Sequence, residues 1–188
     1  VSCEVKGDLV LLDRDGVLNE DRPDYVKSLA EWVWTPGARE SLARLHACGV
    51  RVAVLTNQSC INKGIVAPQT LEAIHRRMTE EAEAADGAID AIFHCPHVDA
   101  DGCDCRKPLP GLLHQAAAHF GRDLAGVPFV GDAGRDLEAA VVAGADPVLV
   151  RTGKGAKTEA EGVATATAVF DDLTAFTDYW LGEREAAC

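Results

Sequence analysis

Hydrophobic residues along the chain form short runs that alternate with longer, amphipathic segments. Apolar runs bounded by turn-forming residues are typical of strands buried in a parallel sheet. Such runs lie at 10–12, 50–55, 88–93, 127–131 and 148–150. The pattern therefore predicts five buried strands, with a closing strand and helix between Ala168 and Trp180.

The segments between these runs carry apolar residues three and four positions apart, which is the spacing of an amphipathic helix. One helix is expected to begin near Thr35 as N-cap, with Pro36 in its first turn and Gly49 at its end. The predicted core faces of the helices are Ala38, Leu42 and Leu45; Leu71, Ile74 and Met78; Leu113, Ala116, Ala117 and Phe120; and Leu137, Ala140 and Val141.

Strands that alternate with helices predict an α/β fold with three layers and a mainly parallel central sheet. The chain has 188 residues, so we expect one domain over 1–188 with a substantial core. Aromatic residues are few, whereas Ala, Val and Leu are abundant, which suits helices packed closely on a sheet.

The formal net charge of -12 disfavours nonspecific binding to nucleic acid or to an anionic membrane. No apolar run reaches the ~20 residues of a membrane span, and the N-terminal residues lack the apolar segment of a signal peptide. We therefore expect a cytoplasmic monomer that acts on a small molecule. An anionic substrate would need a local cluster of basic residues and metal.

Two carboxylates follow the first predicted strand. Asp13 and Asp15 are two residues apart, a spacing that places side chains on the same side of an extended chain, and Gly16 follows them. Ligands of open α/β sheets bind at the carboxyl ends of the strands. Oxygen ligands around an open position suit Mg²⁺, although Asp and Gly are also ordinary turn residues.

Polar residues also follow the second predicted strand. Thr56, Asn57, Gln58 and Ser59 are small hydrogen-bonding side chains that could hold phosphate oxygens without adding charge. An ordinary polar turn is the alternative interpretation.

A cluster of metal-binding residue types follows the third predicted strand. Cys95, His97, Cys103 and Cys105 can close a tetrahedral shell around one Zn²⁺, which predicts a structural zinc in a loop over 95–105. Incidental thiols or a disulfide are the alternatives. The remaining cysteines are scattered and are expected to be plain thiols: Cys3, Cys48, Cys60 and Cys188.

Charged residues complete the candidate chemistry. Arg106 and Lys107 follow the cysteine cluster directly and could neutralise phosphate. Asp132 ends the fourth predicted strand and could be a further acidic contact to Mg²⁺, with Asp136 orienting it or a bound water. Asp136 could instead be a first-turn residue favoured by the helix dipole. Arg151–Gly155 is a basic loop able to meet a second anion.

These motifs together resemble the haloacid dehalogenase (HAD) superfamily of phosphatases and phosphotransferases. DRDGV at 13–17, LTNQS at 55–59, RKP at 106–108 and GDAGRD at 131–136 occur in the order of the four HAD motifs. CPH at 95–97 and CDC at 103–105 are similar to its zinc-bearing, capless subgroup. The resemblance implies a HAD-like Rossmannoid fold without a large cap domain.

The resemblance also implies a Mg²⁺-dependent phosphatase that works through an aspartyl-phosphate. The implied catalytic residues are Asp13 as nucleophile, Asp15 as acid and base, and Thr56 and Lys107 as phosphate-stabilising groups. The implied Mg²⁺ ligands are Asp13, Asp132 and the backbone carbonyl of Asp15. The implied substrate contacts are Asp21, Tyr25, Asn57, Gln58, Ser59 and Arg106.

Within the subgroup, the motifs, with VRTGKG at 150–155, are most similar to members that act on heptose 1,7-bisphosphate. A histidinol-phosphate phosphatase is the alternative, and a phospho-accepting or binding domain without turnover is an alternative of another class. The chain differs from the usual pattern in a longer loop before Tyr25 and in Ala133, where Lys or Arg is common; Arg135 is a candidate replacement.

Overall fold

The fold is built on one parallel sheet. The structure, a computed structural model, describes residues 5–162, 166 and 168–182. Six strands are ordered β3-β2-β1-β4-β5-β6, and every neighbouring pair is parallel. The strands are β1 (Leu9–Leu12), β2 (Arg51–Asn57), β3 (Ala91–Cys95), β4 (Pro128–Gly131), β5 (Asp146–Val150) and β6 (Ala168–Phe170). The predicted parallel α/β sheet is confirmed.

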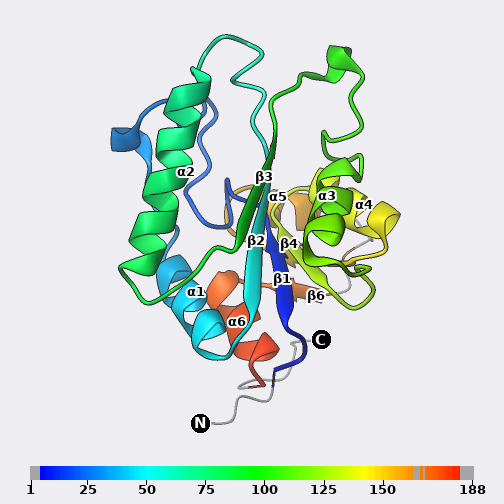
Figure 1. The fold of residues 1–188 in the computed structure, drawn as a ribbon. Coiled ribbons are helices and arrows are strands. Elements are labelled where there is room, and N and C mark those ends of the chain that lie inside the picture. The colour runs from blue at the N-terminus through cyan, green and yellow to red at the C-terminus, as the bar shows by residue number, and fades with distance from the viewer. Residues whose placement is uncertain (1–4, 163–165, 167, 183–188) are drawn as a thin grey trace.

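Helices cover both faces of the sheet and make three layers (Figure 1). They are α1 (Ala38–Ala47), α2 (Pro68–Glu83), α3 (Gly111–Phe120), α4 (Gly134–Ala143), α5 (Gly155–Ala160) and α6 (Leu173–Trp180). Two short 3-10 turns, η1 (Leu29–Glu31) and η2 (Asp99–Asp101), lie in the loops after β1 and β3. Among the described residues no separate cap domain interrupts this arrangement, as predicted.

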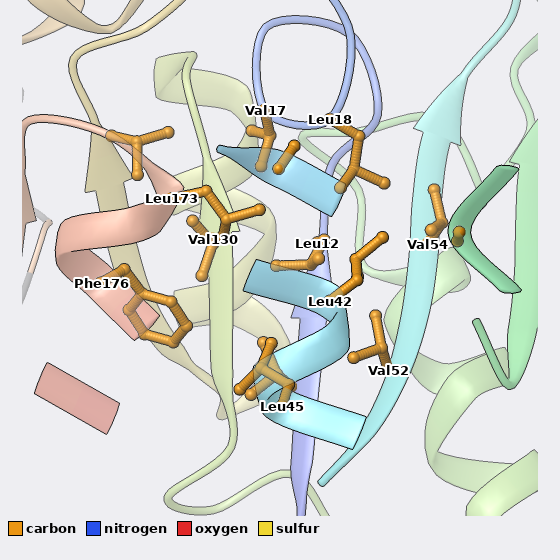
Figure 2. Packing of buried hydrophobic residues seen from close by; sticks show 14 of the residues in the cluster. Leu12, Val17, Leu18, Leu42, Leu45, Val52, Val54, Val130, Leu173 and Phe176 are labelled. Atoms are coloured by element: carbon orange, nitrogen blue, oxygen red, sulfur yellow. The ribbon is translucent and has the colours of Figure 1, made fainter. Parts of the chain in front are cut away.

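The hydrophobic core has two halves, one on each face of the sheet. Alternate strand residues point to opposite faces. Leu12 and Val54 pack with α1, α2 and α6, whereas Leu11 and Leu55 pack with α3 and α4. Figure 2 shows Leu42 of α1 among Leu12, Val52 and Val54. Both halves are needed because a parallel sheet of this kind is apolar on both faces.

The central position of β1 brings the polar strand ends together. Leu12 is in register with Val54 of β2 and with Val130 of β4. The residues that follow these three positions therefore emerge at the same edge of the sheet. The loops after β2 and β3 rise from this edge (Figure 1).

Three details differ from the predictions. Gly37, with φ of 75°, is the N-cap of α1, and the Thr35 hydroxyl instead donates to the carbonyl oxygen of Val17 at 2.6 Å. The strand predicted over 88–93 runs from Ala91 to Cys95, because the Asp90 carboxylate accepts the Val52 N–H at 2.7 Å in place of a backbone carbonyl. Val141 is 51% exposed and not in the core.

No helix in the described ranges is both long enough and apolar enough to cross a membrane.

The packing predicts that truncating two apolar side chains, one buried and one exposed, changes the stability by different amounts. Leu42→Ala should lower the free energy of unfolding by about 2–5 kcal/mol, because Leu42 is fully buried and its truncation leaves a cavity. Val141→Ala, on the exposed side of α4, should change it by less than about 0.5 kcal/mol. Urea denaturation of the two variants measures both values, and equal losses would contradict this account of the core.

Candidate active site and zinc site

Three carboxylates converge at the carboxyl edge of the sheet. Asp13 follows β1, Asp132 follows β4, and Asp136 lies in the first turn of α4. All three are buried, and one oxygen of each lies within 4.8 Å of the others. Gly16 is packed against this group: it has φ of 89°, and a Cβ there would lie 2.1 Å from the Asp132 Oδ2. Only glycine fits this turn.

One buried cation faces the three carboxylates. The Lys107 Nζ lies 2.8 Å from the Asp13 Oδ1 and 2.7 Å from the Asp136 Oδ1. It also donates to the carbonyl oxygen of Leu55 at 2.8 Å. Asn57 holds the same segment, since its side chain donates to the Lys107 carbonyl and accepts from the Lys107 N–H. The ammonium is therefore fixed beside the Asp13 carboxylate.

This charge balance fits a divalent cation. Among the described residues only Lys107 is ion-paired with these carboxylates, and the buried Asp132 Oδ1 has no hydrogen-bond partner. Burial, together with Asp13 and Asp136, raises the pKa of Asp132 to about 8. Burial also raises the pKa of Asp13 to about 6, although Lys107 opposes the shift. A hard cation with oxygen ligands, such as Mg²⁺, would remove this excess of negative charge.

Asp15 lies outside the carboxylate cluster and accepts hydrogen bonds from three side chains. The Arg14 Nη2 donates to both carboxylate oxygens at 2.9 and 3.1 Å, the Asn19 Nδ2 at 2.9 Å and the Gln58 Nε2 at 2.7 Å. Burial alone would raise the pKa of Asp15, but Arg14 and these hydrogen bonds lower it overall. Asp15 is therefore ionised in this arrangement. The role of its backbone carbonyl as a Mg²⁺ ligand stays a prediction.

The residues after β2 have separate contacts. The Thr56 hydroxyl accepts from the Gln58 Nε2 at 2.9 Å, and both side chains are buried. The Ser59 Oγ lies 3.3 Å from the Tyr25 hydroxyl, which accepts from the Lys63 Nζ at 2.7 Å. Gln58 thus links Thr56 to Asp15 inside the site, whereas Ser59 faces the loop that carries Tyr25.

A cavity of about 220 Å³ opens beside Asp15. Five of the six expected substrate contacts line it, and Gln58, which lies beneath, is the exception. Its charged lining has five basic side chains and two acidic ones. The full lining is Asp15, Asp21, Arg22, Pro23, Tyr25, Asn57, Ser59, Lys63, Arg106, Arg135 and Lys154. The cavity is thus locally basic in a chain whose net charge is -12.

The basic loop predicted at 151–155 is tied to the site. The Thr152 hydroxyl donates to the Gly16 carbonyl at 2.6 Å, and the Lys154 N–H donates to the Asp132 Oδ2 at 2.8 Å. The Lys154 Nζ donates to Asp21 at 2.6 Å. The loop therefore connects the carboxylate cluster with the wall of the cavity.

Ala133 carries no charge at the position where Lys or Arg is common in the resembling family. It is buried, and Arg135, two residues on, reaches the cavity with a buried Nε that has no hydrogen-bond partner. Burial would lower the pKa of Arg135, but the carboxylates of Asp136, Asp13 and Asp132 raise it. Arg135 therefore supplies positive charge from the same helix.

The four predicted zinc ligands come together in the loop after β3. The Cys95 Sγ lies 3.7 Å from the Cys103 Sγ and 3.1 Å from the Cys105 Sγ, and the His97 Nδ1 lies 3.3 Å from the Cys105 Sγ. Ligands of a tetrahedral zinc are about 3.5–3.8 Å apart, given metal–ligand distances of about 2.0–2.3 Å, so two of these pairs are a few tenths of an ångström closer than a bound zinc would hold them. All three cysteines are free, which excludes a disulfide among them. The donor set fits Zn²⁺.

The scattered cysteines have different states. Cys60 is a free, buried thiol, as predicted. Cys48 is disulfide-bonded, so the prediction of a plain thiol there is wrong, because spacing along the chain does not reveal which distant residues meet in the fold. Cys3 and Cys188 lie outside the described residues.

Sequence reasoning missed two contacts of the site. Arg14 and Asn19 lie within or next to the first motif, but no local spacing signal indicated that both side chains turn to Asp15. Asp136 was considered as an orienting residue, and the structure places its carboxylate directly in the cluster with Asp13 and Asp132.

The parallel sheet and this site define the class of HAD-like hydrolases. A family profile described as HAD-hydrolase-like matches residues 104–176. The structure is similar to the crystal structure of D,D-heptose 1,7-bisphosphate phosphatase from B. bronchiseptica complexed with magnesium and phosphate. That similarity has a TM-score of 0.91 and 46% identity, and covers 95% of this chain and 100% of that chain.

Curated relatives extend the match. D-glycero-beta-D-manno-heptose-1,7-bisphosphate 7-phosphatase of Pseudomonas aeruginosa is 49% identical over 167 residues, covering 89% of this chain and 94% of that protein. The Escherichia coli K12 protein of the same name is 36% identical over 163 residues, covering 82% of this chain and 85% of that protein. The chain belongs to the family of D-glycero-beta-D-manno-heptose-1,7-bisphosphate 7-phosphatases.

The zinc site predicts one tightly bound Zn²⁺ per chain. Cys95→Ser should abolish stoichiometric zinc and lower the free energy of unfolding by several kcal/mol, on the order expected when a structural metal is lost. Elemental analysis and urea denaturation measure the two effects. Cys60→Ser, which changes a free thiol outside the cluster, should retain the zinc. A fully folded wild-type protein without zinc would contradict the prediction.

The raised pKa of Asp132 predicts a pH-dependent stability difference. Its folded pKa of about 8 lies above the ordinary value of 3.8, so the folded state binds the proton more tightly and loses stability as pH rises from about 4 to 8. In magnesium-free buffer, Asp132→Asn should therefore be more stable than the wild type at pH 8, on the order of 2 kcal/mol, and the difference should shrink at pH 5.

The measurement is urea denaturation at both pH values, with and without Mg²⁺. Mg²⁺ should stabilise the wild type and have little effect on Asp132→Asn. Asp146→Asn, at an exposed position at the start of β5, should show neither effect. A difference between wild type and Asp132→Asn that does not depend on pH would argue against a buried, uncompensated carboxylate.

Proposed function

We propose that this protein is a Mg²⁺-dependent phosphatase that removes the 7-phosphate of D-glycero-D-manno-heptose 1,7-bisphosphate through an aspartyl-phosphate. The observation that carries the proposal is the Asp13 carboxylate, held 2.8 Å from the Lys107 ammonium at the edge of a basic cavity. Family membership and the names of the relatives support the reaction and its substrate.

In the first step, an Asp13 carboxylate oxygen attacks the phosphorus atom in line with the sugar oxygen. A bond forms between that oxygen and phosphorus, and the bond from phosphorus to the sugar oxygen breaks. Lys107 neutralises charge on the transferring group, and the Thr56 hydroxyl donates to a phosphate oxygen. When bound at Asp13 and Asp132, with Asp136 nearby, Mg²⁺ would supply further neutralisation of charge.

Asp15 is the acid in the first step and the base in the second. It protonates the leaving sugar oxygen, then takes a proton from the water that attacks the aspartyl-phosphate, which releases phosphate and restores Asp13. Its lowered pKa suits the second role. A phosphate dianion bound nearby is a like charge that would raise the proton affinity of Asp15 for the first role.

The basic cavity favours a substrate with a second anionic group. Arg22, Lys63, Arg106, Arg135 and Lys154 surround a space that continues from the Asp15 side of the site. A sugar bisphosphate carries a second phosphate for these residues to bind. Histidinol phosphate carries cationic nitrogen groups at its other end, which the same residues would repel. The cavity therefore favours the bisphosphate over this alternative.

The remaining predictions from the sequence stay part of the proposal. A single phosphatase domain over 1–188 is supported by the one sheet that all six strands share. The cytoplasmic location and the monomeric state stay predictions. A phospho-accepting domain without turnover is the alternative of another class, and persistent phosphorylation of Asp13 would distinguish it.

The first test is phosphate release with Mg²⁺ present, comparing heptose 1,7-bisphosphate with histidinol phosphate at matched concentrations. We expect a marked preference for the bisphosphate, no turnover by Asp13→Asn, and a loss of about 10²–10⁴-fold in kcat for Asp15→Asn. Preference for histidinol phosphate would overturn the substrate assignment. Absence of turnover that depends on Asp13 with either compound would overturn the proposed phosphatase activity on these substrates.

A further inference from the structure

Arg14 is an arginine buried between the two aspartates of the first motif. Only 1% of it is exposed, and a buried guanidinium requires partners for its donors. Its Nη2 contacts both oxygens of Asp15, and its Nη1 lies 3.2 Å from the His75 Nε2. The Arg14 Cζ also lies 5.9 Å from the centre of the Trp32 ring. The orientation of Arg14 therefore depends on residues far along the chain.

His75 has the protonation state that this contact needs. A guanidinium has only donors, so the His75 Nε2 must accept, which requires a neutral imidazole with its proton on Nδ1. Burial, followed by the nearby Arg14, lowers the pKa of His75 to about 3. His75 lies in α2 and its ring meets that of His94 edge-on at 5.7 Å. Helix α2 thus contributes a neutral acceptor directly behind the first motif.

Arg14 connects His75 to Asp15, which is the acid and base of the proposed reaction. Of the three side chains that donate to Asp15, Arg14 alone is charged; Asn19 and Gln58 are neutral amides. The buried Arg14 Nε already has no hydrogen-bond partner, so without an acceptor at position 75 a second donor would be unsatisfied and the guanidinium would shift to satisfy it. A displacement of about 1 Å in a catalytic group can cost on the order of 10²-fold in rate.

We propose that Arg14 and His75 form a positioning pair that sets the orientation of the Asp15 carboxylate. His75 of α2 holds the Arg14 guanidinium in place, and the guanidinium donates hydrogen bonds to Asp15. The inference rests on the proposed function of Asp15 as acid and base. The Arg14 backbone N–H donates to the Asp13 Oδ1 at 2.7 Å, but the contacts of the two side chains lead to Asp15, so both side chains act through Asp15.

The test separates the acid role from general damage by the choice of leaving group. A sugar alkoxide needs a proton to leave, whereas p-nitrophenolate leaves without one. The ratio kcat/KM reports on steps up to the first irreversible one, which is formation of the aspartyl-phosphate. A misplaced Asp15 therefore lowers kcat/KM for an alkyl phosphate and leaves it nearly unchanged for p-nitrophenyl phosphate.

His75→Leu removes the acceptor, and His75→Gln restores one through its side-chain carbonyl. We expect His75→Leu to lose about tenfold or more in kcat/KM for heptose 1,7-bisphosphate and less than about twofold for p-nitrophenyl phosphate, with His75→Gln largely restored. Arg14→Lys should show the same selective loss, because a lysine keeps the charge without the planar fork. His114→Leu, at an exposed position of α3, is the matched control and should match the wild type.

Equal losses with both substrates in His75→Leu, or no recovery in His75→Gln, would assign His75 a structural role and overturn the inference. Wild-type kinetics in His75→Leu would overturn it as well. If His75→Leu does not fold, as judged by circular dichroism, Arg14→Lys with the same two substrates decides the question. Failure of the proposed function is distinct, since the wild type itself would then release no phosphate from heptose 1,7-bisphosphate.

Discussion

Three buried carboxylates that share one lysine are the constraint on which the site depends. Asp13, Asp132 and Asp136 are brought together by two neighbouring strands and a helix, and Lys107 neutralises only part of their charge. A fold tolerates such a cluster only when other interactions hold it and a cation completes it. The excess of negative charge destabilises the metal-free site and for the same reason favours binding of a divalent cation.

The loop that carries the Cys/His cluster leads directly to Lys107. Lys107 comes two residues after Cys105, so a metal that fixes the cysteines also limits where the lysine can go. Asn57 adds two hydrogen bonds to the Lys107 backbone from the end of β2. Asn57 thus anchors Lys107 to the sheet on one side, and a metal held by the Cys/His cluster would anchor the same loop on the other side.

Charge is distributed unevenly over the molecule. The chain has a net charge of -12, yet the cavity beside Asp15 is lined by more basic than acidic side chains. Several of these bases are paired, as Lys154 is with Asp21, and Arg106 is with Asp99. Such pairs hold the side chains in place before a ligand arrives, so an anionic substrate meets a preorganised site and less ordering is required on binding.

Sequence alone determined the parallel α/β fold, the four residues that form the Cys/His cluster and the aspartates of the site that follow β1 and β4. These features follow from local patterns: apolar runs make buried strands, and polar residues at the ends of adjacent parallel strands meet at one edge. The tertiary structure alone decided the partners of each side chain. It placed Asp136 in the carboxylate cluster, turned Arg14 toward Asp15 and set His75 behind it. In the tertiary structure Val141 is exposed and Cys48 forms a disulfide bond. Such contacts join residues far apart along the chain, as Arg14 and His75 are at 61 positions, and they depend on how helices pack, which no short spacing encodes.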